Sequence, residues 1–590
     1  MTTSQQWAVR PLTPEEIYTD RQEHLDYFYK AALSATERRS MSSVMLGHRR
    51  MGKTEIFKRV VNRLFWEQDH RDPQAAVPVF FTFPDEVLSR KEFALSYVEN
   101  FIRWYAAFRL RDISVFSEPK YRHELFDSLN QRMEITKTFY IAFDLLSAIE
   151  RDGATLPDKQ ALYLPREISD LQDSTIVMFL DEFQNTHLPE YQFRVVGFMQ
   201  EAVESPTCPH FVTGSAMSIL VQDILGRGAL FGRFSHDPIE GLTEYWGAEL
   251  ALRTARYYRT DLPELMAPVI AKRCGGNPFY ITSIIRQAAR QGKDIRDEDA
   301  LSEMLAMDIS SGFIWAELHD QVSRWIAKVN EYGITKWVLY LASCEKEERI
   351  DLARIQRELR ERQGQDADIP TIKDVLVRLS RGDLIDYKSF GDWFGKIKDP
   401  VLNEFLRVWG RCEVLGESRG TVRQETVVRA NRIKKRLDEY KGYLAEVFMI
   451  QLLWSSQGKT LPGRHFHTEE DIRMPDRFIF IAQRGRFGAG QGMETDIHAA
   501  AGLDIWLAES KWWEKPVGPG AVRHLLDQAE LLRERDGHDM RIRLWLFAHN
   551  GVTAPAENLM REHGVLWSVR ADLDALLKLA GLRELPVLED

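Results

Sequence analysis

The sequence predicts a multidomain α/β protein in which a parallel-sheet domain comes first and a second, smaller α/β domain comes last. Three observations support this fold class. The 590 residues exceed the roughly 250 to 300 at which a single core stops growing. Short apolar runs end in a glycine at residue 47 and in acids at residue 181, which is typical of strands in a parallel sheet. A second group of apolar strands with charged ends follows residue 470.

The composition is that of an ordinary globular protein. Hydrophobic residues make up 44% of the chain and charged residues 28%, and the formal net charge is −10. The chain as a whole is therefore no polycation, and nucleic-acid binding needs a local basic surface. No apolar run reaches the length of a membrane span, and the N-terminus lacks the pattern of a signal peptide. We therefore expect a cytoplasmic protein with no membrane partner.

A glycine-rich loop follows the first apolar strand. Gly47, Gly52, Lys53 and Thr54 match G-x-x-x-x-G-K-[ST] within SSVMLGHRRMGKTEIF. The glycines let backbone N–H groups point at phosphate oxygens, the lysine reaches the outer phosphates, and the threonine hydroxyl is a ligand for Mg²⁺. Apolar residues at helical spacing follow, so a helix N-terminus faces the anion. We predict that these four residues bind ATP, with Thr54 as a metal ligand.

A later strand supplies the acids that act together with a phosphate loop. Residues 176–180 are five consecutive apolar residues, typical of a central parallel strand that is buried on both faces. Asp181 and Glu182 follow at its carboxyl end. We predict that Asp181 holds Mg²⁺ and that Glu182 orients and activates the attacking water. The alternative is a buried strand that ends in two solvated acids.

Two further segments carry candidate nucleotide contacts. PHFVTGSAMSIL indicates a strand that ends in Thr213, Gly214 and Ser215, where polar groups can sense the terminal phosphate from the neighbouring strand. An ordinary turn with a helix cap at Ser215 fits these residues equally well. Arg233, in LFGRF, is a candidate for contact with the nucleotide of its own or a neighbouring subunit. The alternative for Arg233 is a surface charge.

These motifs together resemble the archaeal-type ATPase family, which belongs to the STAND branch of the AAA-like P-loop NTPases. The resemblance is carried by the loop GHRRMGKT with Arg49 and Arg50, and by FLDEFQ, TGS, Gly232-Arg233 and CGGNPFYI. It covers residues 15 to 300. It implies ATP and Mg²⁺ as cofactors, with both loop arginines, Ser215 and Arg233 in the nucleotide site. The family's first helix usually carries Arg followed by Glu, whereas here Gln follows Arg21.

A small helical unit is expected from residue 334. Three helices are indicated by ITKWVLYLASCE, DLARIQRELRER and TIKDVLVRLSRG, followed by a hairpin with a turn at Gly391-Asp392. This order resembles the winged helix of the same family, which either grips DNA or packs against the nucleotide domain. The predicted division is an ATPase domain at 15–240, a helical lid at 241–325, a winged helix at 326–415, a basic linker at 416–435 and a C-terminal domain at 436–590.

The C-terminal domain carries charged residues in an ordered pattern. KGYLAEVFMIQLLW indicates an amphipathic helix with Glu446 among apolar neighbours, and three strands follow. Asp496 lies in the second strand, while Glu509 and Lys511 lie two residues apart in the third, so that their side chains share one face. Two carboxylates and a lysine suit metal-dependent cleavage of a phosphodiester. Asp496 and Glu509 are predicted to bind Mg²⁺ or Mn²⁺, and Lys511 to position or activate the water.

This arrangement resembles the PD-(D/E)xK superfamily, the restriction-endonuclease fold. The resemblance implies that Glu446 corresponds to the acid on the first helix and that Gln528, on the helix after the core strand, contributes a polar side chain. The usual Pro-Asp dipeptide is absent at Asp496, and Glu494 can share or replace its role. The alternative is an α/β module with a degraded site. Modules of this superfamily often act in pairs, which implies a homo-oligomer.

We therefore predict an ATP-binding and ATP-hydrolysing switch that controls a Mg²⁺-dependent DNA endonuclease. By analogy with such machines, its role is defence against phage or plasmid DNA. The alternative is a regulatory ATPase whose winged helix binds DNA and whose last domain is an inactive docking module. The two hypotheses differ at Asp496, Glu509 and Lys511, because only cleavage requires these side chains.

Overall fold

The computed structural model describes residues 6–587 apart from 86–88, 188–194, 215–229, 231, 330–332, 365–366, 381, 383, 389–391, 431–436, 488–492 and 537–538. The chain forms two compact units. The first comprises Met1–Gly241, Asn277–Ser283 and Met307–Arg423, and the second comprises Leu242–Gly276, Ile284–Ala306 and Gln424–Asp590. Among the described residues, no helix is long and apolar enough to cross a membrane.

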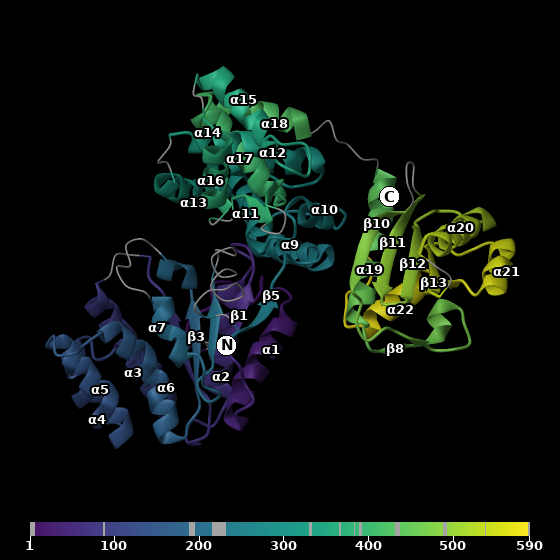
Figure 1. The fold of residues 1–590 in the computed structure, drawn as a ribbon. Coiled ribbons are helices and arrows are strands. Elements are labelled where there is room, and N and C mark those ends of the chain that lie inside the picture. The colour runs from purple at the N-terminus through teal and green to yellow at the C-terminus, as the bar shows by residue number, and fades with distance from the viewer. Residues whose placement is uncertain are drawn as a thin grey trace. The chain divides into compact units, whose positions relative to one another are not determined.

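A five-stranded parallel sheet forms the centre of the first unit (Figure 1). In order across the sheet, its strands are β2 (Val77–Thr82), β3 (Ile176–Asp181), β4 (His210–Thr213), β1 (Ser43–Leu46) and β5 (Ser235–Pro238). Each neighbouring pair is parallel. The predicted parallel sheet is therefore confirmed, and β3 lies inside it with all of its residues buried, as the apolar run indicated.

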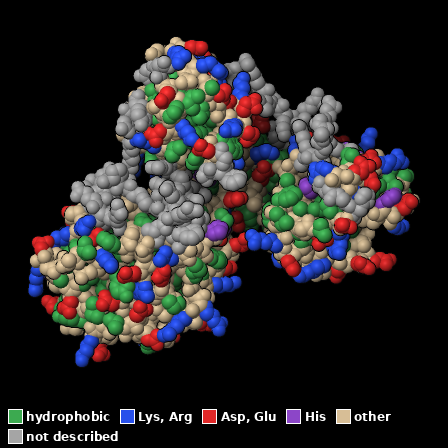
Figure 2. Space-filling view, viewed as in Figure 1, with side chains coloured by type: hydrophobic (Ala, Val, Ile, Leu, Met, Phe, Trp, Pro, Cys, Tyr) green, Lys and Arg blue, Asp and Glu red, His purple; other side chains and the backbone are tan. Residues whose placement is uncertain are grey.

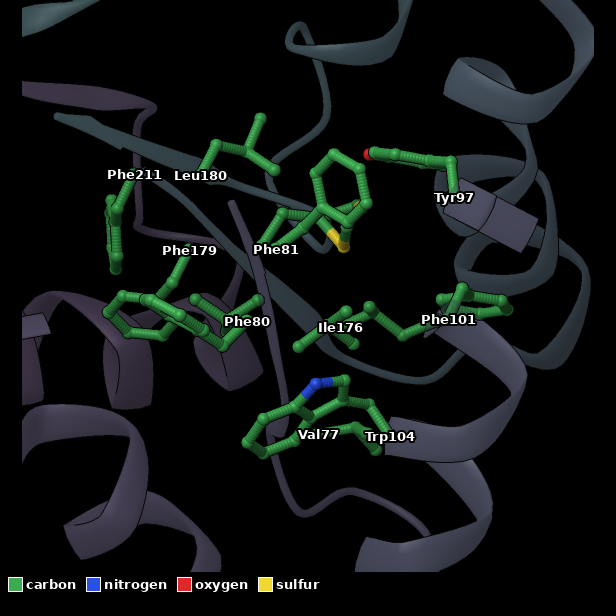
Figure 3. Packing of buried hydrophobic residues seen from close by; sticks show 14 of the residues in the cluster. Val77, Phe80, Phe81, Tyr97, Phe101, Trp104, Ile176, Phe179, Leu180 and Phe211 are labelled. Atoms are coloured by element: carbon green, nitrogen blue, oxygen red, sulfur yellow. The ribbon is translucent and has the colours of Figure 1, made fainter. Parts of the chain in front are cut away.

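Helices pack on this sheet because successive strand side chains point to opposite faces. Phe81 of β2 contacts Tyr97 of helix α3, with ring centroids 4.9 Å apart. Phe179 of β3 contacts Phe57 of helix α2 at 5.3 Å. Figure 3 shows the aromatic side chains that meet in this core. The helices of the sheet region are α1 (Gln22–Ser34), α2 (Lys53–Glu67), α3 (Arg90–Leu110), α4 (Leu125–Asn130), α5 (Lys137–Glu150), α6 (Pro157–Gln172) and α7 (Val195–Ala202).

Mainly helical segments follow the sheet. They are α9 (Glu244–Tyr258), α10 (Met266–Arg273), α11 (Pro278–Gln291), α12 (Glu298–Ser311), α13 (Phe313–Val329), α14 (Thr335–Ser343), α15 (Leu352–Gln363), α16 (Ile369–Ser380), β6 (Asp386–Lys388), β7 (Trp393–Gly395), α17 (Pro400–Glu413) and α18 (Arg419–Ala430). The three helices and antiparallel hairpin expected after residue 334 are present. The predicted turn residue Gly391 lies outside the described residues. Most of the predicted basic linker is helix α18.

The last part of the second unit contains a mixed five-stranded sheet in the order β10, β11, β12, β13, β14. The first two neighbouring pairs are antiparallel and the last two are parallel. The elements are α19 (Leu437–Ser455), β8 (Thr460–Leu461), β9 (Ile472–Arg473), β10 (Phe480–Phe487), β11 (Met493–Ala501), β12 (Asp504–Lys511), α20 (Pro519–Asp536), β13 (Arg541–Ala548), α21 (Ala554–His563), β14 (Leu566–Ser568) and α22 (Arg570–Leu579). Helix α20 connects β12 to its parallel neighbour, as a parallel pair requires.

Strand β12 separates two apolar cores. Trp506 and Ala508 pack into the core that contains α19 and α22. Ile505 and Leu507 pack with residues of α20 and α21 into the other. Alternation along the strand then places Glu509 and Lys511 on the α20 face. On the surface shown in Figure 2, Lys and Arg side chains of the described residues lie among Asp and Glu side chains.

Candidate functional site

The phosphate loop connects β1 to the N-terminus of α2. Gly52 precedes the helix with φ of +94°, a conformation that glycine adopts without steric cost. Gly47 starts the loop against Ile239. A Cβ atom at residue 47 would lie 2.4 Å from Ile239 Cγ2 and 2.5 Å from its carbonyl oxygen. The loop therefore requires both glycines, one for its turn and one for the close approach of two backbones.

Lys53 folds back over this loop. It is the first residue of α2, and its side chain is buried. Its Nζ donates to the carbonyl oxygens of Gly47 and His48, each at 2.6 Å. An ammonium group has three rotatable donors and can exchange such carbonyls for phosphate oxygens. The position therefore fits the predicted contact with the outer phosphates.

Thr54 and Asp181 meet beside the loop. The Thr54 hydroxyl donates to the Asp181 carboxylate at the end of β3. Burial raises the pKa of Asp181 to about 6, the neighbouring Glu182 charge adds to this effect, and the Thr54 hydrogen bond opposes it. A hydroxyl and a carboxylate are oxygen ligands of the kind that Mg²⁺ takes, and a cation there would favour the ionised carboxylate.

Glu182 follows directly in an uncommon backbone conformation. Its φ is +54°, in the left-handed region that non-glycine residues rarely adopt. Its carboxylate accepts a hydrogen bond from Gln184. Conformations of this kind cost about 1–3 kcal/mol and are concentrated at functional sites. The backbone therefore turns sharply at the residue that was predicted to orient water.

Thr213 occupies the end of β4, between the loop strand and the acidic strand. It pairs with Met45 of β1, and Val212 beside it pairs with Leu180 of β3. Its side chain is fully buried, and its hydroxyl has no hydrogen-bond partner within the described part of the chain. The predicted Ser215 lies outside the described residues. The described site therefore contains an unsatisfied hydroxyl at Thr213, where a phosphate oxygen would supply its partner.

The three arginines predicted to bind nucleotide contact protein groups. Arg50 Nε donates to Glu317 at 3.0 Å, and its guanidinium lies 5.0 Å from the centre of the Phe279 ring. The carbonyl of Arg49 accepts from Asn277 at 3.4 Å. Arg233 pairs with Glu204 at 2.7 Å. Nucleotide contact by these arginines stays a prediction.

A second group of charged side chains meets on the mixed sheet. Lys511 Nζ lies 2.5 Å from Glu509 Oε2 and 3.7 Å from Asp496 Oδ2. The same Asp496 oxygen accepts the backbone N–H of Ser510 at 2.9 Å. Asp496 and Glu509 come from adjacent antiparallel strands. The structure thus brings together the three side chains that the sequence pattern singled out, which we call the acidic cluster.

Gln528 reaches the acidic cluster from helix α20. It is fully buried, and its Nε2 donates to Glu509 Oε1 at 3.0 Å and to the carbonyl of Glu494 at 2.9 Å. Its Oε1 is buried without a hydrogen-bond partner among the described residues. The side chain of Glu494 is exposed, and its carbonyl is the group that joins the cluster. Gln528 therefore fixes one carboxylate oxygen of Glu509.

Burial and mutual charge set the ionisation of the acidic cluster. Burial raises the pKa of Asp496 to about 7, the Glu509 charge adds to this, and Lys511 opposes it. Burial also opposes the charge on Glu509, but the Lys511 charge and hydrogen bonds from Lys511 and Gln528 lower the pKa of Glu509. Despite burial, Glu509 and Asp496 raise the pKa of Lys511. Lys511 is thus held charged between the two acids.

Glu446 lies on α19 and is almost fully buried. It accepts a hydrogen bond from Gln483 at 2.7 Å, and its two carboxylate oxygens lie 3.3 and 3.4 Å from guanidinium nitrogens of Arg484. Its negative charge also acts on Asp496 and Lys511. The predicted helix acid therefore belongs to the same electrostatic group as the acidic cluster, with Gln483 and Arg484 as its hydrogen-bond donors.

The acidic cluster fits Mg²⁺ better than a metal held by protein ligands alone. In the part of the chain that is described, no three acidic, histidine or cysteine side chains form a group that could hold a metal ion. Asp496 and Glu509 offer two carboxylates. Mg²⁺ usually keeps several waters and binds through one or two carboxylates plus substrate phosphate. Two carboxylates beside a buried amide oxygen satisfy that requirement.

Two residues of these sites, Gln483 and Arg484, escape prediction from the sequence. Thr213 is predicted as part of TGS, and its burial adds that its hydroxyl lacks a partner among the described residues. Gln483 and Arg484 stand in an expected strand with no motif around them. Their proximity to Glu446 depends on how α19 packs across the sheet, which local sequence does not specify.

Comparison with known proteins yields distant structural matches. No protein-family model matches the chain, and no curated protein matches it. A Walker-type ATPase of Pyrococcus abyssi is 17% identical, with 68% of this chain and 99% of that chain covered and a TM-score of 0.43. The ORC2 protein of Aeropyrum pernix with ADPNP and ADP is 14% identical, with 69% and 97% covered and a TM-score of 0.38. The ORC1 protein of the same organism in complex with DNA is 11% identical, with 67% and 94% covered and a TM-score of 0.35.

Proposed function

We propose that this protein is an ATP-dependent switch that controls a Mg²⁺-dependent DNA endonuclease. The observation that carries the proposal is the meeting of Asp496, Glu509 and Lys511 on one face of the mixed sheet, with Lys511 Nζ 2.5 Å from Glu509 and 3.7 Å from Asp496. Two acids and a cation that share a partly buried site on adjacent strands suit cleavage of a phosphodiester. The order helix, three strands and helix around them supports a restriction-endonuclease-like domain.

In this proposal each residue of the acidic cluster has a defined role. Asp496 and Glu509 hold Mg²⁺, which supplies Lewis-acid polarisation of the scissile phosphate when it is bound. Lys511 donates a hydrogen bond to the attacking water and keeps it in line with the phosphorus atom. Gln528 fixes the orientation of Glu509 through its 3.0 Å hydrogen bond. Exclusion of bulk water by the buried side chains strengthens all of these interactions.

The first unit supplies the nucleotide site. Lys53 contacts the outer phosphates, Thr54 and Asp181 hold Mg²⁺, and Glu182 orients the attacking water. The Thr213 hydroxyl, which lacks a partner among the described residues, contacts the terminal phosphate from β4. Loss of that phosphate removes the contact. Hydrolysis therefore changes the contacts of Thr213 at the end of the central strand β4.

Control of the nuclease is supported by contacts between α9 and α19 in the second unit. The Thr243 hydroxyl, which caps α9, donates to Gln451 of α19 at 2.7 Å. The Tyr443 hydroxyl of α19 donates to Glu244 of α9. The chain runs four residues from Ile239, which touches Gly47 of the phosphate loop, to this cap. A change at the loop therefore has a short covalent path to α9, which is hydrogen-bonded to the helix that carries Glu446.

DNA binding in this proposal involves the winged helix as well as the nuclease domain. Helices α14, α15 and α16 followed by the β6–β7 hairpin have the order of a winged helix. The formal net charge of −10 leaves DNA recognition to local contacts rather than to the whole surface. DNA is therefore the proposed substrate, and a homo-oligomer is the proposed state for cleavage of both strands.

The first test is a gel assay of the purified full chain. Supercoiled and linear DNA are incubated with Mg²⁺ or Mn²⁺, with and without ATP, and phosphate release is measured in parallel. The variants are Lys511→Ala, with exposed Lys515→Ala as its control, and Lys53→Ala, with Lys58→Ala on the same helix as its control. We expect cleavage to disappear in Lys511→Ala while phosphate release persists.

The Lys53→Ala variant separates the switch from the nuclease. We expect this variant to lose phosphate release. The rate of DNA cleavage should also change, because bound nucleotide no longer controls the nuclease. Intact DNA with every metal, together with Lys53-dependent phosphate release, would instead favour a regulatory ATPase with an inactive docking domain. Cleavage that survives Lys511→Ala would place the nuclease site elsewhere or in a contaminant.

The proposed biological role is defence against phage or plasmid DNA. Its support is the combination of a nucleotide switch with a nuclease-like domain. Cells that carry the wild-type chain should lower the plating efficiency of a susceptible phage or the yield of transformation, and the Lys511→Ala variant should not. Equal protection by the wild-type chain and the Lys511→Ala variant would show that defence does not require DNA cleavage.

A further inference from the structure

Gln483 and Arg484 are neighbours in strand β10, yet both side chains bind Glu446. Gln483 donates at 2.7 Å, and Arg484 donates from Nε and from one terminal nitrogen at 3.4 and 3.3 Å. In a regular strand, successive side chains point to opposite faces. Arg484 breaks this alternation because its φ is +53°, in the left-handed region. The backbone is thus bent at Arg484, and this bend directs its guanidinium to Glu446 of α19, beside Gln483.

Arg484 also lies within electrostatic reach of Asp496 on the neighbouring strand. Gln483 pairs with Ile497 and Gly485 pairs with Thr495, so Arg484 and Asp496 occupy the intervening positions of the two strands. The charges of Glu446, Asp496 and Glu494 raise the pKa of Arg484, although burial works in the other direction. Arg484 is therefore a permanent cation at the edge of the acidic cluster rather than a remote partner of Glu446.

Exposure distinguishes Arg484 from the other charged groups. Its side chain is 34% exposed, compared with 20% for Lys511 and 4% for Glu446. Glu446 binds Nε and one terminal nitrogen, while a guanidinium carries five N–H donors in a planar fork. The fork matches the oxygens of a phosphate group. Arg484 is therefore the cation of this group that a large anionic ligand can reach.

A second observation indicates that the cluster takes a ligand. Gln528 is fully buried on the opposite side of Glu509, and its Oε1 has no hydrogen-bond partner among the described residues. A buried acceptor without a partner costs about 1–3 kcal/mol, a cost that a bound group or its water relieves. The acidic cluster therefore has an unsatisfied acceptor in its interior and a reachable cation at its rim.

We propose that Arg484 binds a backbone phosphate of nucleic acid next to the scissile bond, and that Glu446 with Gln483 holds its guanidinium ready for this contact. This inference rests on the proposed function in one respect, namely that the ligand of the acidic cluster is nucleic acid. It does not require cleavage. The residue acts in binding and positioning, and the phosphate takes the guanidinium donors that Glu446 leaves available.

The test measures DNA binding by the full chain in Ca²⁺, without cleavage as the readout. Arg484→Ala should weaken binding about tenfold, the loss of one charge-assisted hydrogen-bonded contact. The slope of log affinity against log salt concentration should fall in magnitude by about 0.9, the value for one phosphate contact. Arg541→Ala is the control, because Arg541 is exposed and pairs with Asp504 at the opposite end of β12. The Arg541→Ala variant should keep the DNA affinity and the salt slope of the wild-type chain.

A double-mutant comparison separates phosphate binding from a purely structural role. Glu446→Gln leaves Arg484 in place but removes the opposing charge, so DNA affinity should be kept or increased. Arg484→Ala in that background should still lose about tenfold in affinity. If Arg484 serves only to pair with Glu446, the second substitution has no further effect, and the inference is wrong. Thermal unfolding of each variant identifies those that fail to fold, and Arg484→Lys then replaces Arg484→Ala.

The outcome is distinguishable from failure of the nuclease proposal. DNA binding that depends on Arg484 in a protein that never cleaves supports the inference and contradicts the nuclease. Cleavage by wild-type protein with unchanged DNA affinity and salt slope in the Arg484 variants supports the nuclease and overturns the inference. Absence of DNA binding by the wild-type chain overturns the inference as well.

Discussion

Thr213 combines two properties that are seldom found together in a protein interior. Its side chain is fully buried, and its hydroxyl has no hydrogen-bond partner in the described structure. Leaving such a group unsatisfied costs about 1–3 kcal/mol, so a residue chosen for stability alone would be apolar. The position between Met45 and the acidic strand explains the hydroxyl if it serves a bound phosphate.

Thr213→Val should therefore separate stability from activity. Valine has nearly the same shape without the hydroxyl, so the melting temperature should stay the same or rise. ATP turnover should fall about tenfold, the effect of losing one hydrogen bond to a charged group. Thr213→Ser keeps the hydroxyl and should retain most of the activity. A valine variant with normal phosphate release would exclude Thr213 from the nucleotide site.

His210 makes the stability of the first unit depend on pH. Burial lowers the pKa of His210 from its ordinary value of 6.5 to about 4, and the Arg166 charge acts in the same direction. The folded state therefore binds fewer protons than the unfolded state, so stability is complete above the ordinary pKa and declines as pH falls towards 4. At pH 5 the loss is about 2 kcal/mol.

The His210 effect is measurable by thermal unfolding at pH 7 and pH 5. We expect the melting temperature of the wild-type chain to fall between these values, and His210→Gln to remove part of the fall. His210→Gln is also expected to lower stability at pH 7, because the ring fills a buried position. An identical pH dependence in both proteins would show that other groups cause the decline.

At the scale of elements, α19 contacts both α9 and strand β10. Tyr443 and Glu446 are three residues apart, so they lie on neighbouring positions of one helix face. Tyr443 donates to Glu244 of α9, while Glu446 accepts from Gln483 and Arg484 of β10. Burial raises the pKa of Glu244, and the charge of Glu446 acts in the same direction. A displacement of α9 therefore acts on the acid that holds Arg484.

Tyr443→Phe tests this link. It removes the hydroxyl that donates to Glu244, and the partly buried carboxylate loses about 1 kcal/mol of stabilisation. Hydrogen exchange should become faster in α9 and in the first turns of the described part of α19, while ATP hydrolysis persists. The effect of ATP on DNA cleavage should decrease. Tyr387→Phe removes a similar hydrogen bond, from Tyr387 to the exposed Asp392, and should leave hydrogen exchange in α9 and α19 unchanged.

At the scale of the whole molecule, the two compact units have separate apolar cores. One core surrounds the parallel sheet, and two others line the faces of the mixed sheet. Proteins with several domains seldom unfold in a single two-state transition. The stability of each unit is therefore a separate quantity, and a ligand of one site acts first on the unit that contains it.

Calorimetry should accordingly resolve at least two unfolding transitions. Mg²⁺ and ATP at about 100 times the dissociation constant stabilise the unit that binds them by about 3 kcal/mol, and Lys53→Ala should abolish that shift. Leu525→Ala removes side-chain volume from the core beside β12. It should lower the free energy of unfolding of the second unit by about 2–5 kcal/mol. A single transition that moves as a whole in both experiments would indicate one cooperative structure.

Local sequence determined the phosphate loop, the acidic strand and the alternation of side chains along β12. Each of these is set by interactions within a few residues: glycines where φ is positive, apolar runs where both faces are buried, and alternation where one face is polar. Glu509 and Lys511 share a face for this reason, and the structure places them beside each other.

Only the tertiary structure decided which groups from distant segments meet. Asp496 joins Glu509 and Lys511 through the antiparallel register of β11 and β12, and Gln528 joins them because α20 packs on that face. Arg50 pairs with Glu317, 267 residues away, and Arg484 pairs with Glu446 across the sheet. Such contacts depend on how whole elements pack together, which the local sequence around each residue does not specify.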